Sequence, residues 1–173
     1  MNIILCNYGT HAGAILDILN EAIVNSTALY DYQPRAPDSM TGWFKAKEDG
    51  GFPVIGAVSS LGQLLGFATY GTFRAWPAYK YSVEHSVYVH KDHRGKGVGA
   101  RLLQALVAEA EEHQYHAMVG GIDVTNYASI RLHEKRGFVH AGTIRQAAFK
   151  FETWRDLGFY QLLLATPVHP LDG

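Results

Sequence analysis

The amino-acid sequence predicts a mixed α/β domain, and three observations support this fold class. Apolar residues recur at helical spacing in some segments, apolar and polar residues alternate in others, and the two kinds of segment interleave along the chain. The predicted order is β-α-α-β-β-β-α-β-α-β-β. With 173 residues, of which 47% are hydrophobic and 18% charged, the chain can bury one core. We expect a single domain over residues 1–173.

The first half of the chain begins with a strand and a helix and ends with a hairpin. Asp38 and Ser39 are candidate N-caps for a second helix. Gly62, in the SSLGQ turn between two β-rich runs, can take a positive φ. The predicted elements are a strand at residues 2–8, helices at 11–26 and from 39 to about 48, and a hairpin within 52–73.

The second half alternates between strands and helices before a final pair of strands. In residues 83–89, Val83 and His85 alternate with Glu84 and Ser86, which indicates a strand. Gly137 suits the C-terminal end of a helix that begins near Asn126. The other predicted elements are a helix from 97 to about 113, a strand at 117–124, a helix at 126–137, and strands at 138–144 and 157–165.

Composition and charge restrict the partners of the chain. The net charge of −1 argues against a nucleic-acid-binding protein, so any anion recognition must be local. A single cysteine, Cys6, cannot form an internal disulfide and reads as an inert buried thiol. The start lacks the basic region of a signal peptide, and no run of eighteen apolar residues occurs. We expect a cytoplasmic protein without membrane or nucleic-acid partners.

The glycine-rich stretch KDHRGKGVGA admits several interpretations. It could be a plain turn between a strand and a helix. A phosphate-binding loop of the Walker type is excluded, because no Ser or Thr follows Lys96. A dinucleotide fingerprint fits Gly95, Gly97 and Ala100, with Asp123 after the next strand, but the preceding hairpin and the short remaining chain argue against that topology.

The fourth interpretation uses more of the residues in this stretch. Arg94, Gly97 and Gly99 form R-x-x-G-x-G, with a second cation at Lys96. Glycines let successive backbone N–H groups turn toward one centre, and the following helix adds its positive N-terminal end. The pattern therefore indicates a pyrophosphate site.

These residues resemble a known family. The segment VYVHKDHRGKGVGARLL is similar to the acetyl-CoA signature of the GCN5-related N-acetyltransferases (GNAT), and NYASIRLHEKRGF resembles a later motif of that family. EHSVYV and the tail IRQAAFKFETWRDLGFYQL resemble the phosphinothricin and methionine sulfone acetyltransferase group. The resemblance implies a GNAT fold with a splayed central sheet and an acyltransferase that forms a homodimer.

The resemblance also implies acetyl-CoA as the cosubstrate, with direct transfer of its acetyl group to a small-molecule amine. A backbone N–H of Val87 or Val89 would stabilise the oxyanion. The residues that the resemblance assigns to acetyl-CoA are Val87, Tyr88, Val89, Arg94, Gly95, Lys96, Gly97, Val98, Gly99, Ala100, Asn126 and Lys135.

The resemblance assigns two catalytic residues. An α-ammonium group must lose a proton before it attacks a thioester, and Glu84 matches the base of the family. A solvated strand carboxylate is the alternative for Glu84. His133 stands where many members have a tyrosine acid, and a packing role is an equal alternative for this histidine. Tyr127 is a second candidate acid.

Substrate selection is expected from residues near the third predicted strand. Arg74 can bind the carboxylate of an amino acid through two parallel hydrogen bonds. Trp76 and Phe73, together with Tyr30 and Tyr32, could form the walls of an apolar pocket, although aromatic residues are more often part of a core. The complete substrate-binding prediction is Phe73, Arg74, Trp76, Glu84, His85 and Ser86, with a satisfied core histidine as the alternative for His85.

The remaining residue patterns do not point to a metal site. His90 and His93, and likewise His113 and His116, lack further ligands, so no metal is expected. Gly120 and Gly121 indicate either a close backbone approach or a bulge. The leading hypothesis is acetylation of the α-amine of a small amino acid such as methionine sulfone, methionine sulfoximine or phosphinothricin. Alternatives are acetylation of a peptide N-terminus, a dinucleotide-dependent oxidoreductase and a non-catalytic acyl-CoA-binding module.

Overall fold

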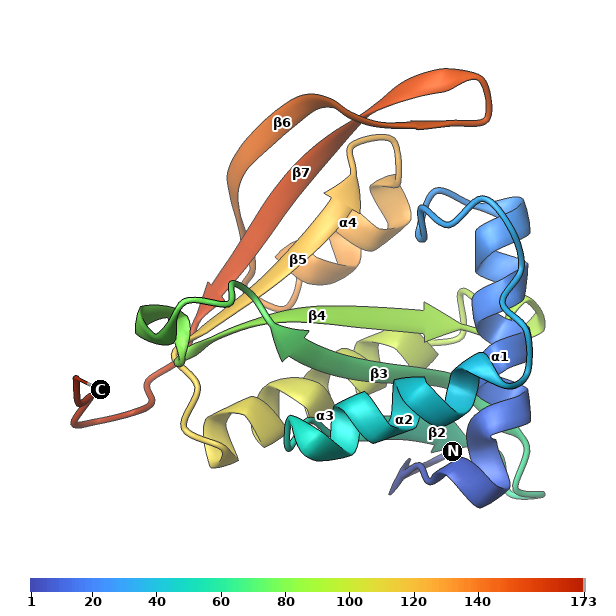
Figure 1. Cartoon of the computed structure of the whole chain (residues 1–173), viewed down its shortest axis with the longest axis horizontal. Coiled ribbons are helices and arrows are strands. Elements are labelled where there is room, and N and C mark those ends of the chain that lie inside the picture. Colours follow the sequence, from blue (N-terminus) through green and yellow to red (C-terminus); the bar gives the residue numbers. More distant parts are fainter. Residues whose placement is uncertain (173) are drawn as a thin grey trace. The chain divides into compact units, whose positions relative to one another are not determined.

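The computed structural model describes residues 1–172, and the helices and strands follow one another in the predicted order (Figure 1). The mixed α/β fold class is thereby confirmed. Two short 3₁₀ helices, at Pro77–Tyr79 and Lys91–His93, were not predicted. The elements are β1 (Asn2–Leu5), α1 (Tyr8–Asn25), α2 (Ser39–Asp49), β2 (Val54–Val58), β3 (Leu64–Thr72), β4 (Ser82–Val89), α3 (Val98–Glu112), β5 (Ala117–Asp123), α4 (Tyr127–Glu134), β6 (Val139–Lys150) and β7 (Thr153–Leu163).

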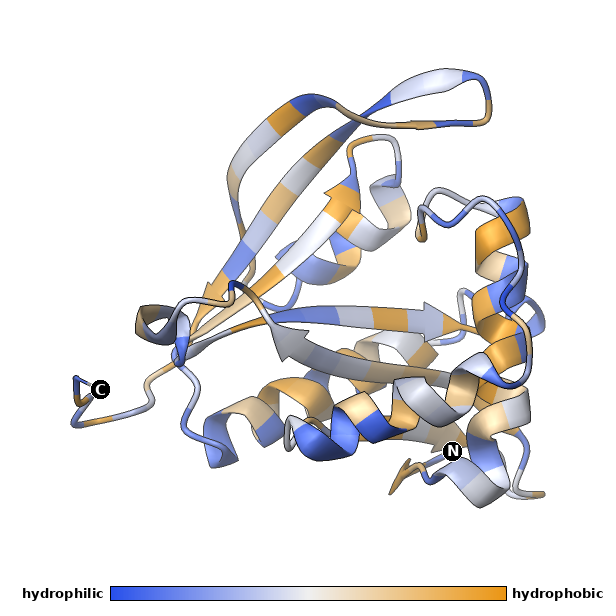
Figure 2. Ribbon diagram, in the orientation of Figure 1, coloured by the Kyte–Doolittle hydropathy of each residue, from blue (hydrophilic) through white to orange (hydrophobic). Residues whose placement is uncertain are grey.

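The chain divides into two compact units, and β3, β4 and α3 each contribute residues to both. The first unit comprises residues 1–69 and 86–106, with its strands in the order β1-β2-β3-β4. Its core consists of the apolar side of α1, Met40 of α2 and residues of β2 and β3, among which Phe67 is fully buried. Figure 2 shows the apolar residues of α1 interrupted by hydrophilic ones, as an amphipathic helix requires.

The second unit comprises residues 70–85 and 107–172, with strands in the order β4-β5-β7-β6. The β4–β5 pair is parallel, whereas the β5–β7 and β6–β7 pairs are antiparallel. The buried residues of β5 include Met118 and Ile122, and Phe138 after α4 is also buried. A polar strand, β4, therefore lies beside an apolar one in this unit.

The start of α1 corrects the predicted boundaries of the first strand and the first helix. The strand ends at Leu5, and the helix begins at Tyr8 rather than at residue 11. Asn7 is the N-cap, since its Oδ1 accepts a hydrogen bond from the Thr10 N–H at 2.9 Å. The Asn7 N–H in turn donates to Nδ1 of His11 at 3.1 Å. Reciprocal capping moves the boundary, and the sequence pattern NYGTH is the signal for it.

The other helix ends agree with the predictions in part. Asp38 precedes α2 but its side chain forms no capping hydrogen bond, and the Ser39 hydroxyl donates to the Ala36 carbonyl. Asn126 does cap α4, because its Oδ1 accepts from the Ser129 N–H at 3.1 Å. Helix α4 ends at Glu134, earlier than predicted, and Gly137 beyond it has a φ of +87°.

The C-terminal hairpin is longer than predicted. Strands β6 and β7 pair as far as Lys150 with Thr153, and the turn consists of Phe151 and Glu152 with φ of +52° and +56°. Positive φ at both central residues is typical of tight hairpin turns, where glycine or asparagine is the usual residue. Because neither stands here, the sequence carried no turn signal. Gly62 does have the expected positive φ, at +79°.

Removing the Asn7 cap should destabilise the chain. We expect Asn7→Ala to lower the free energy of unfolding by about 1 kcal/mol, because the Thr10 N–H loses its acceptor. Urea unfolding measures this as a lower midpoint with an unchanged slope. Asn25→Ala, at the other end of α1 on an exposed position, is the control. Equal midpoints for the two variants would contradict the capping role.

Candidate functional site: a glycine-rich loop and a two-faced strand

The chain enters α3 through the glycine-rich loop of the first unit. Gly95 and Gly97 have φ of +73° and +79°, left-handed values that favour glycine. The Gly97 carbonyl accepts a helical hydrogen bond from the Arg101 N–H at 3.2 Å. N–H groups in the first turn of a helix, here including Gly99 and Ala100, have no intrahelical partner and attract phosphate oxygens. The loop therefore fits the predicted pyrophosphate site.

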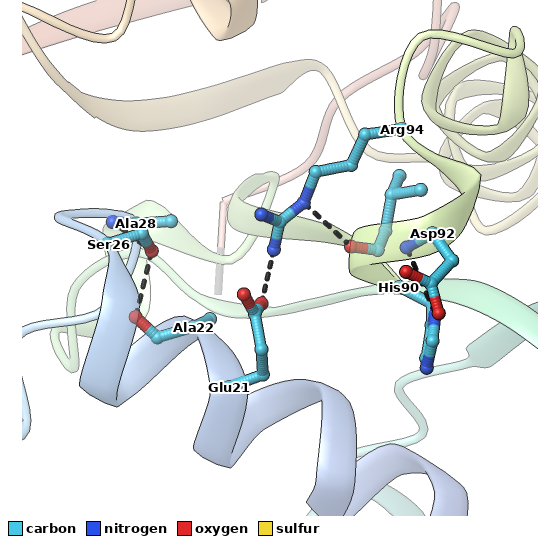
Figure 3. A network of polar contacts seen from close by, with 8 residues as sticks. Glu21, Ala22, Ser26, Ala28, His90, Asp92 and Arg94 are labelled. Carbon is cyan, nitrogen blue, oxygen red and sulfur yellow. Dashed lines mark hydrogen bonds and ion pairs between the residues drawn. The ribbon is translucent and has the colours of Figure 1, made fainter.

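The two cations of this loop differ in their surroundings. Arg94 Nε donates to the Val89 carbonyl at 3.2 Å, and its guanidinium forms an ion pair with Glu21 of α1 (Figure 3). Lys96 Nζ donates to the Asp92 carbonyl at 2.8 Å. Sequence analysis missed Glu21, whose carboxylate offsets part of the Arg94 charge. Arg94 thus fixes the loop to α1, while the exposed Lys96 forms no ion pair with any of residues 1–172.

The end of β4, which the resemblance assigns to acetyl-CoA, runs close to β3. A Cβ atom added to Gly66 would lie 2.7 Å from the Tyr88 carbonyl oxygen and 3.1 Å from Val89 Cα. The Tyr88 ring packs on Phe67, with centroids 5.4 Å apart. The side chain of Tyr88 therefore belongs to packing, and a cofactor contact at residues 87–89 would involve the backbone. Glycine inside a predicted strand is the signal that could have revealed this approach.

In the second unit, β4 places two neighbouring polar side chains on opposite faces. It pairs with β5 from Ser82↔Ala117 to Glu84↔Val119. Glu84 is half-buried, whereas His85 is only 6% exposed, as alternation along a strand requires. Burial raises the pKa of Glu84 above its ordinary value, and the charge of Arg74 acts in the opposite direction.

Gly120 of β5 makes room for the His85 ring. A Cβ at Gly120 would lie 2.7 Å from Cε1 of His85. A Cβ at Gly121 would lie 3.4 Å from both Oε1 of Glu84 and Cδ1 of Leu157, an ordinary van der Waals contact. Of the two interpretations of these glycines, a close approach holds for Gly120, where the approaching atoms belong to a side chain, and the β5–β7 register runs through both residues without a bulge.

His85 and His133 contact each other, as the core alternative given for His85 and the packing alternative given for His133 would have it, and their direct roles stay predictions. His85 Nδ1 lies 2.9 Å from the Val119 carbonyl, and its Nε2 lies 2.8 Å from Nε2 of His133. His133 is 4% exposed, and its Nδ1 lies 2.7 Å from the Ser129 carbonyl. Since all four ring nitrogens are engaged, neither histidine has a nitrogen open to a substrate or a leaving thiolate in this structure. Burial lowers the pKa of both imidazoles.

The predicted substrate residues of the β3–β4 connection come together around Tyr79, which sequence analysis did not single out. The centroid of the Tyr79 ring lies 5.9 Å from that of the Phe73 ring and 6.4 Å from that of the Trp76 ring. The Arg74 guanidinium lies 4.8 Å above the Phe73 ring, and its charge acts on Glu84. A cation, aromatic rings and a carboxylate therefore belong to one part of the second unit.

The remaining predicted positions are on exposed or capping sites. Tyr127, the second candidate acid, is 65% exposed. Lys135 is exposed at the C-terminal end of α4, and the Asn126 side chain caps the other end. In the first unit, Tyr32 is exposed in the loop between α1 and α2. Contacts of these residues with acetyl-CoA or substrate stay predictions, as does that of Ser86, which follows His85 on β4.

Residues 1–172 contain no group of three or more His, Cys, Asp or Glu side chains arranged to hold a metal ion. No helix in the same range is both long and apolar enough to cross a bilayer.

Burial raises the pKa of the Cys6 thiol to about 12, as expected for an inert cysteine.

Comparison with known proteins identifies the family. Residues 15–138 match the family described as Acetyltransferase (GNAT) family. An L-methionine sulfoximine/L-methionine sulfone acetyltransferase of Pseudomonas paraeruginosa is 43% identical over 87% of each chain, and the L-amino acid N-acyltransferase MnaT of Escherichia coli is 40% identical over 91% of each. A phosphinothricin N-acetyltransferase of Streptomyces coelicolor is 34% identical over 85% of this chain and 87% of its own.

Solved structures agree with this match. A chain from Acinetobacter baylyi ADP1 is 58% identical with a TM-score of 0.98, covering 99% of this chain and 96% of its own. A Salmonella typhimurium protein solved with its cofactor acetyl-CoA is 37% identical with a TM-score of 0.93, covering 98% and 97%. A ribosomal-protein-alanine N-acetyltransferase of Brucella melitensis is 36% identical with a TM-score of 0.92, covering 95% and 100%.

The chain is therefore an enzyme of the GNAT acetyltransferase family, and the resemblance inferred from its motifs is confirmed.

The close fit at Gly120 leads to a stability prediction. We expect Gly120→Ala to lower the free energy of unfolding by roughly 1–3 kcal/mol, because the new methyl group would overlap the His85 ring, which two hydrogen bonds hold in place. Thermal or urea unfolding measures the loss. Gly13→Ala, in α1 with no atom within 4 Å of the added Cβ, is the control and should be neutral or stabilising. Similar stability of the two variants would contradict the close fit.

Proposed function

We propose that this chain transfers the acetyl group of acetyl-CoA to the α-amino group of a small L-amino acid. The observation that carries the proposal is the placement of Arg74 and Glu84 in the second unit, where the guanidinium charge acts on the half-buried carboxylate. An α-amino acid carries its carboxylate and its amine on one carbon. A cation for the carboxylate and a base for the amine therefore match this substrate class.

Glu84 is the proposed base. Its raised pKa makes Glu84 a better proton acceptor near neutral pH than an ordinary glutamate. The charge of Arg74 limits this rise, so the carboxylate stays ionised and able to accept a proton. The α-ammonium group of the substrate gives up one proton to Glu84, directly or through water, and becomes a nucleophile. The amine nitrogen would then bond to the thioester carbonyl carbon of acetyl-CoA and the C–S bond would break, so that coenzyme A leaves as a thiolate and takes up the proton that the acetylated nitrogen releases. The backbone N–H groups of α3 and the Lys96 ammonium would bind its pyrophosphate.

The names of the relatives support a sulfone-like substrate. Proteins about 40% identical to this chain are described by activity on L-methionine sulfoximine, L-methionine sulfone or L-amino acids, and more distant ones by activity on phosphinothricin. Phe73, Trp76 and Tyr79 offer aromatic surface for such a side chain. A second candidate acceptor is a protein N-terminal alanine, which the name of the Brucella relative favours.

We further propose a cytoplasmic homodimer. Exposed apolar residues of β6, β7 and their turn provide a surface for a second copy: Val139, Ile144, Phe149, Phe151, Trp154 and Leu163. The lone Cys6 supports a reducing compartment. Light scattering tests the first part, since a monomer at micromolar concentration would contradict it, and cell fractionation tests the second.

Replacing the proposed base should reduce turnover without affecting cofactor binding. We expect Glu84→Gln to lower kcat by about 10²–10⁴-fold, because the amide accepts no proton from the substrate ammonium. Calorimetry with acetyl-CoA should give nearly the wild-type affinity. Glu112→Gln, at the exposed end of α3, is the matched control. Unchanged turnover would remove Glu84 from its role, and binding of NADH in place of acetyl-CoA would favour the oxidoreductase alternative.

The role of Arg74 can be separated from its effect on Glu84. With an L-amino acid substrate, Arg74→Gln should lower kcat/KM by roughly 10–100-fold, because the carboxylate loses a charged partner. With the decarboxylated amine, the same variant should change kcat/KM little. The acidic limb of the pH profile should move to higher pH, because Arg74 no longer lowers the pKa of Glu84. Lys80→Gln is the control, and equal losses on both substrates would contradict carboxylate recognition.

A further inference from the structure

The buried pair of His85 and His133 has more hydrogen bonds than two neutral imidazoles can supply. His85 Nδ1 faces the Val119 carbonyl at 2.9 Å, and His133 Nδ1 faces the Ser129 carbonyl at 2.7 Å. A carbonyl oxygen is only an acceptor, so each Nδ1 must carry a proton. The two Nε2 atoms lie 2.8 Å apart, and this contact needs a third proton. Two neutral histidines carry only two ring N–H protons.

We propose that His85 and His133 share one proton between their Nε2 atoms, so that the pair carries a single positive charge in the folded chain. His85 is then a positioning residue, since it fixes both the ring orientation and the protonation of His133. Removing the shared proton would leave two lone pairs facing each other at 2.8 Å.

One neutral arrangement of the two rings competes with the shared proton. The Ser129 hydroxyl lies 3.4 Å from His133 Nδ1 and could donate to it, which would free a proton for the Nε2 contact. That arrangement, however, would place the lone pair of Nδ1 against the Ser129 carbonyl oxygen at 2.7 Å. The carbonyl contact is the shorter of the two, so it determines that Nδ1 is a donor.

The surroundings of the pair tolerate one positive charge and exclude two. The buried Phe138 ring has its centroid 5.2 Å from that of His85 and 5.1 Å from that of His133, and it packs tilted to the first ring and edge-on to the second. Burial lowers the pKa of each histidine, and the charge of His133 lowers the pKa of His85 further, which opposes a second added proton. The three hydrogen bonds of the pair oppose this lowering of the pKa and retain the first added proton.

The elements packed against the pair carry other charged groups, none of which bonds to the ring nitrogens within residues 1–172. They are Glu84 on β4, Asp123 on β5, and Arg131, Glu134 and Lys135 on α4 or its end.

The pair also has a consequence for the reaction, and this part rests on the proposed function. Glu84 directly precedes His85 on β4, so the positive charge of the pair favours the ionised form of the carboxylate. It would oppose the effect of burial, which raises the pKa of Glu84. In this way a buried pair that does not touch the substrate would keep the base ready to accept a proton.

Nitrogen NMR tests the shared proton directly on the resting protein. In histidine-labelled wild-type protein between pH 6 and 8, two rings should show protonated Nδ1 atoms together with Nε2 atoms of intermediate, partly protonated character. In His85→Gln, the Gln amide can donate to His133 Nε2, so His133 should become a neutral ring with an unprotonated Nε2. Two fully neutral rings in the wild type, one of them protonated at Nε2 alone, would overturn the proposal.

Stability as a function of pH gives an independent test. In the unfolded chain, histidines lose their added proton above an ordinary pKa of about 6.5, whereas the folded pair keeps one. The folded state therefore binds more protons above about pH 7, so stability falls as the pH rises until the pair itself is deprotonated. Relative to His85→Gln, the unfolding equilibrium constant of the wild type should rise by up to about tenfold per pH unit.

The exposed His140 provides the control, because His140→Gln removes a histidine outside the pair. This variant should follow the wild-type pH dependence. Parallel stability curves for wild type and His85→Gln above pH 7 would show that the folded pair is neutral and would overturn the proposal.

The pH profile of kcat/KM separates this proposal from the proposed function. His85→Gln should move the acidic limb to higher pH, which a loss of packing alone would not do. If the wild type has no acidic limb, the role of Glu84 fails while the NMR result on the pair still stands. If the limb exists and does not move, the electrostatic part of the present proposal is overturned.

Discussion

The contact between the His85 ring and the backbone of β5 is the constraint on which the second unit depends. The ring hydrogen-bonds to the Val119 carbonyl, and its Cε1 atom lies 2.7 Å from the place that a Cβ of residue 120 would take. Because side chains alternate along a strand, burying His85 places Glu84 on the opposite face of β4. Gly120 of β5 thus accepts the buried His85 ring on one face, while Glu84 lies on the other face of β4.

The first unit meets a different requirement, which is to present backbone N–H groups to an anion. The left-handed glycines, the start of α3 and the tie from Arg94 to Glu21 all shape one loop. Its charge is modest, since Glu21 offsets Arg94, so in the proposed site recognition would rest largely on the helix N-terminus and Lys96. This explains how a chain with a net charge of −1 can carry a site for a strongly anionic cosubstrate.

Much of the fold could be predicted from local patterns, while contacts between distant segments could not. Alternation in β4 and helical spacing in α3 are local, and so is the cap at Asn126. The β6–β7 hairpin was underestimated because Phe151 and Glu152 form a left-handed turn without glycine. Motifs indicated Glu84, Arg74 and the glycine loop. The pairing of His85 with His133 joins residues 48 positions apart, which no single segment shows.

The central claim is that the second unit recognises a free amino acid, with Arg74 for its carboxylate and Glu84 for its amine. Release of the coenzyme A thiol from acetyl-CoA, measured across a panel of acceptors, tests this most directly. The panel should contain L-methionine sulfone, L-methionine sulfoximine, phosphinothricin, their carboxamides and a peptide with N-terminal alanine. We predict rapid release with the free amino acids and slow release with the carboxamides and the peptide. Rapid release with the peptide alone, or equal rates with acids and carboxamides, would contradict the account.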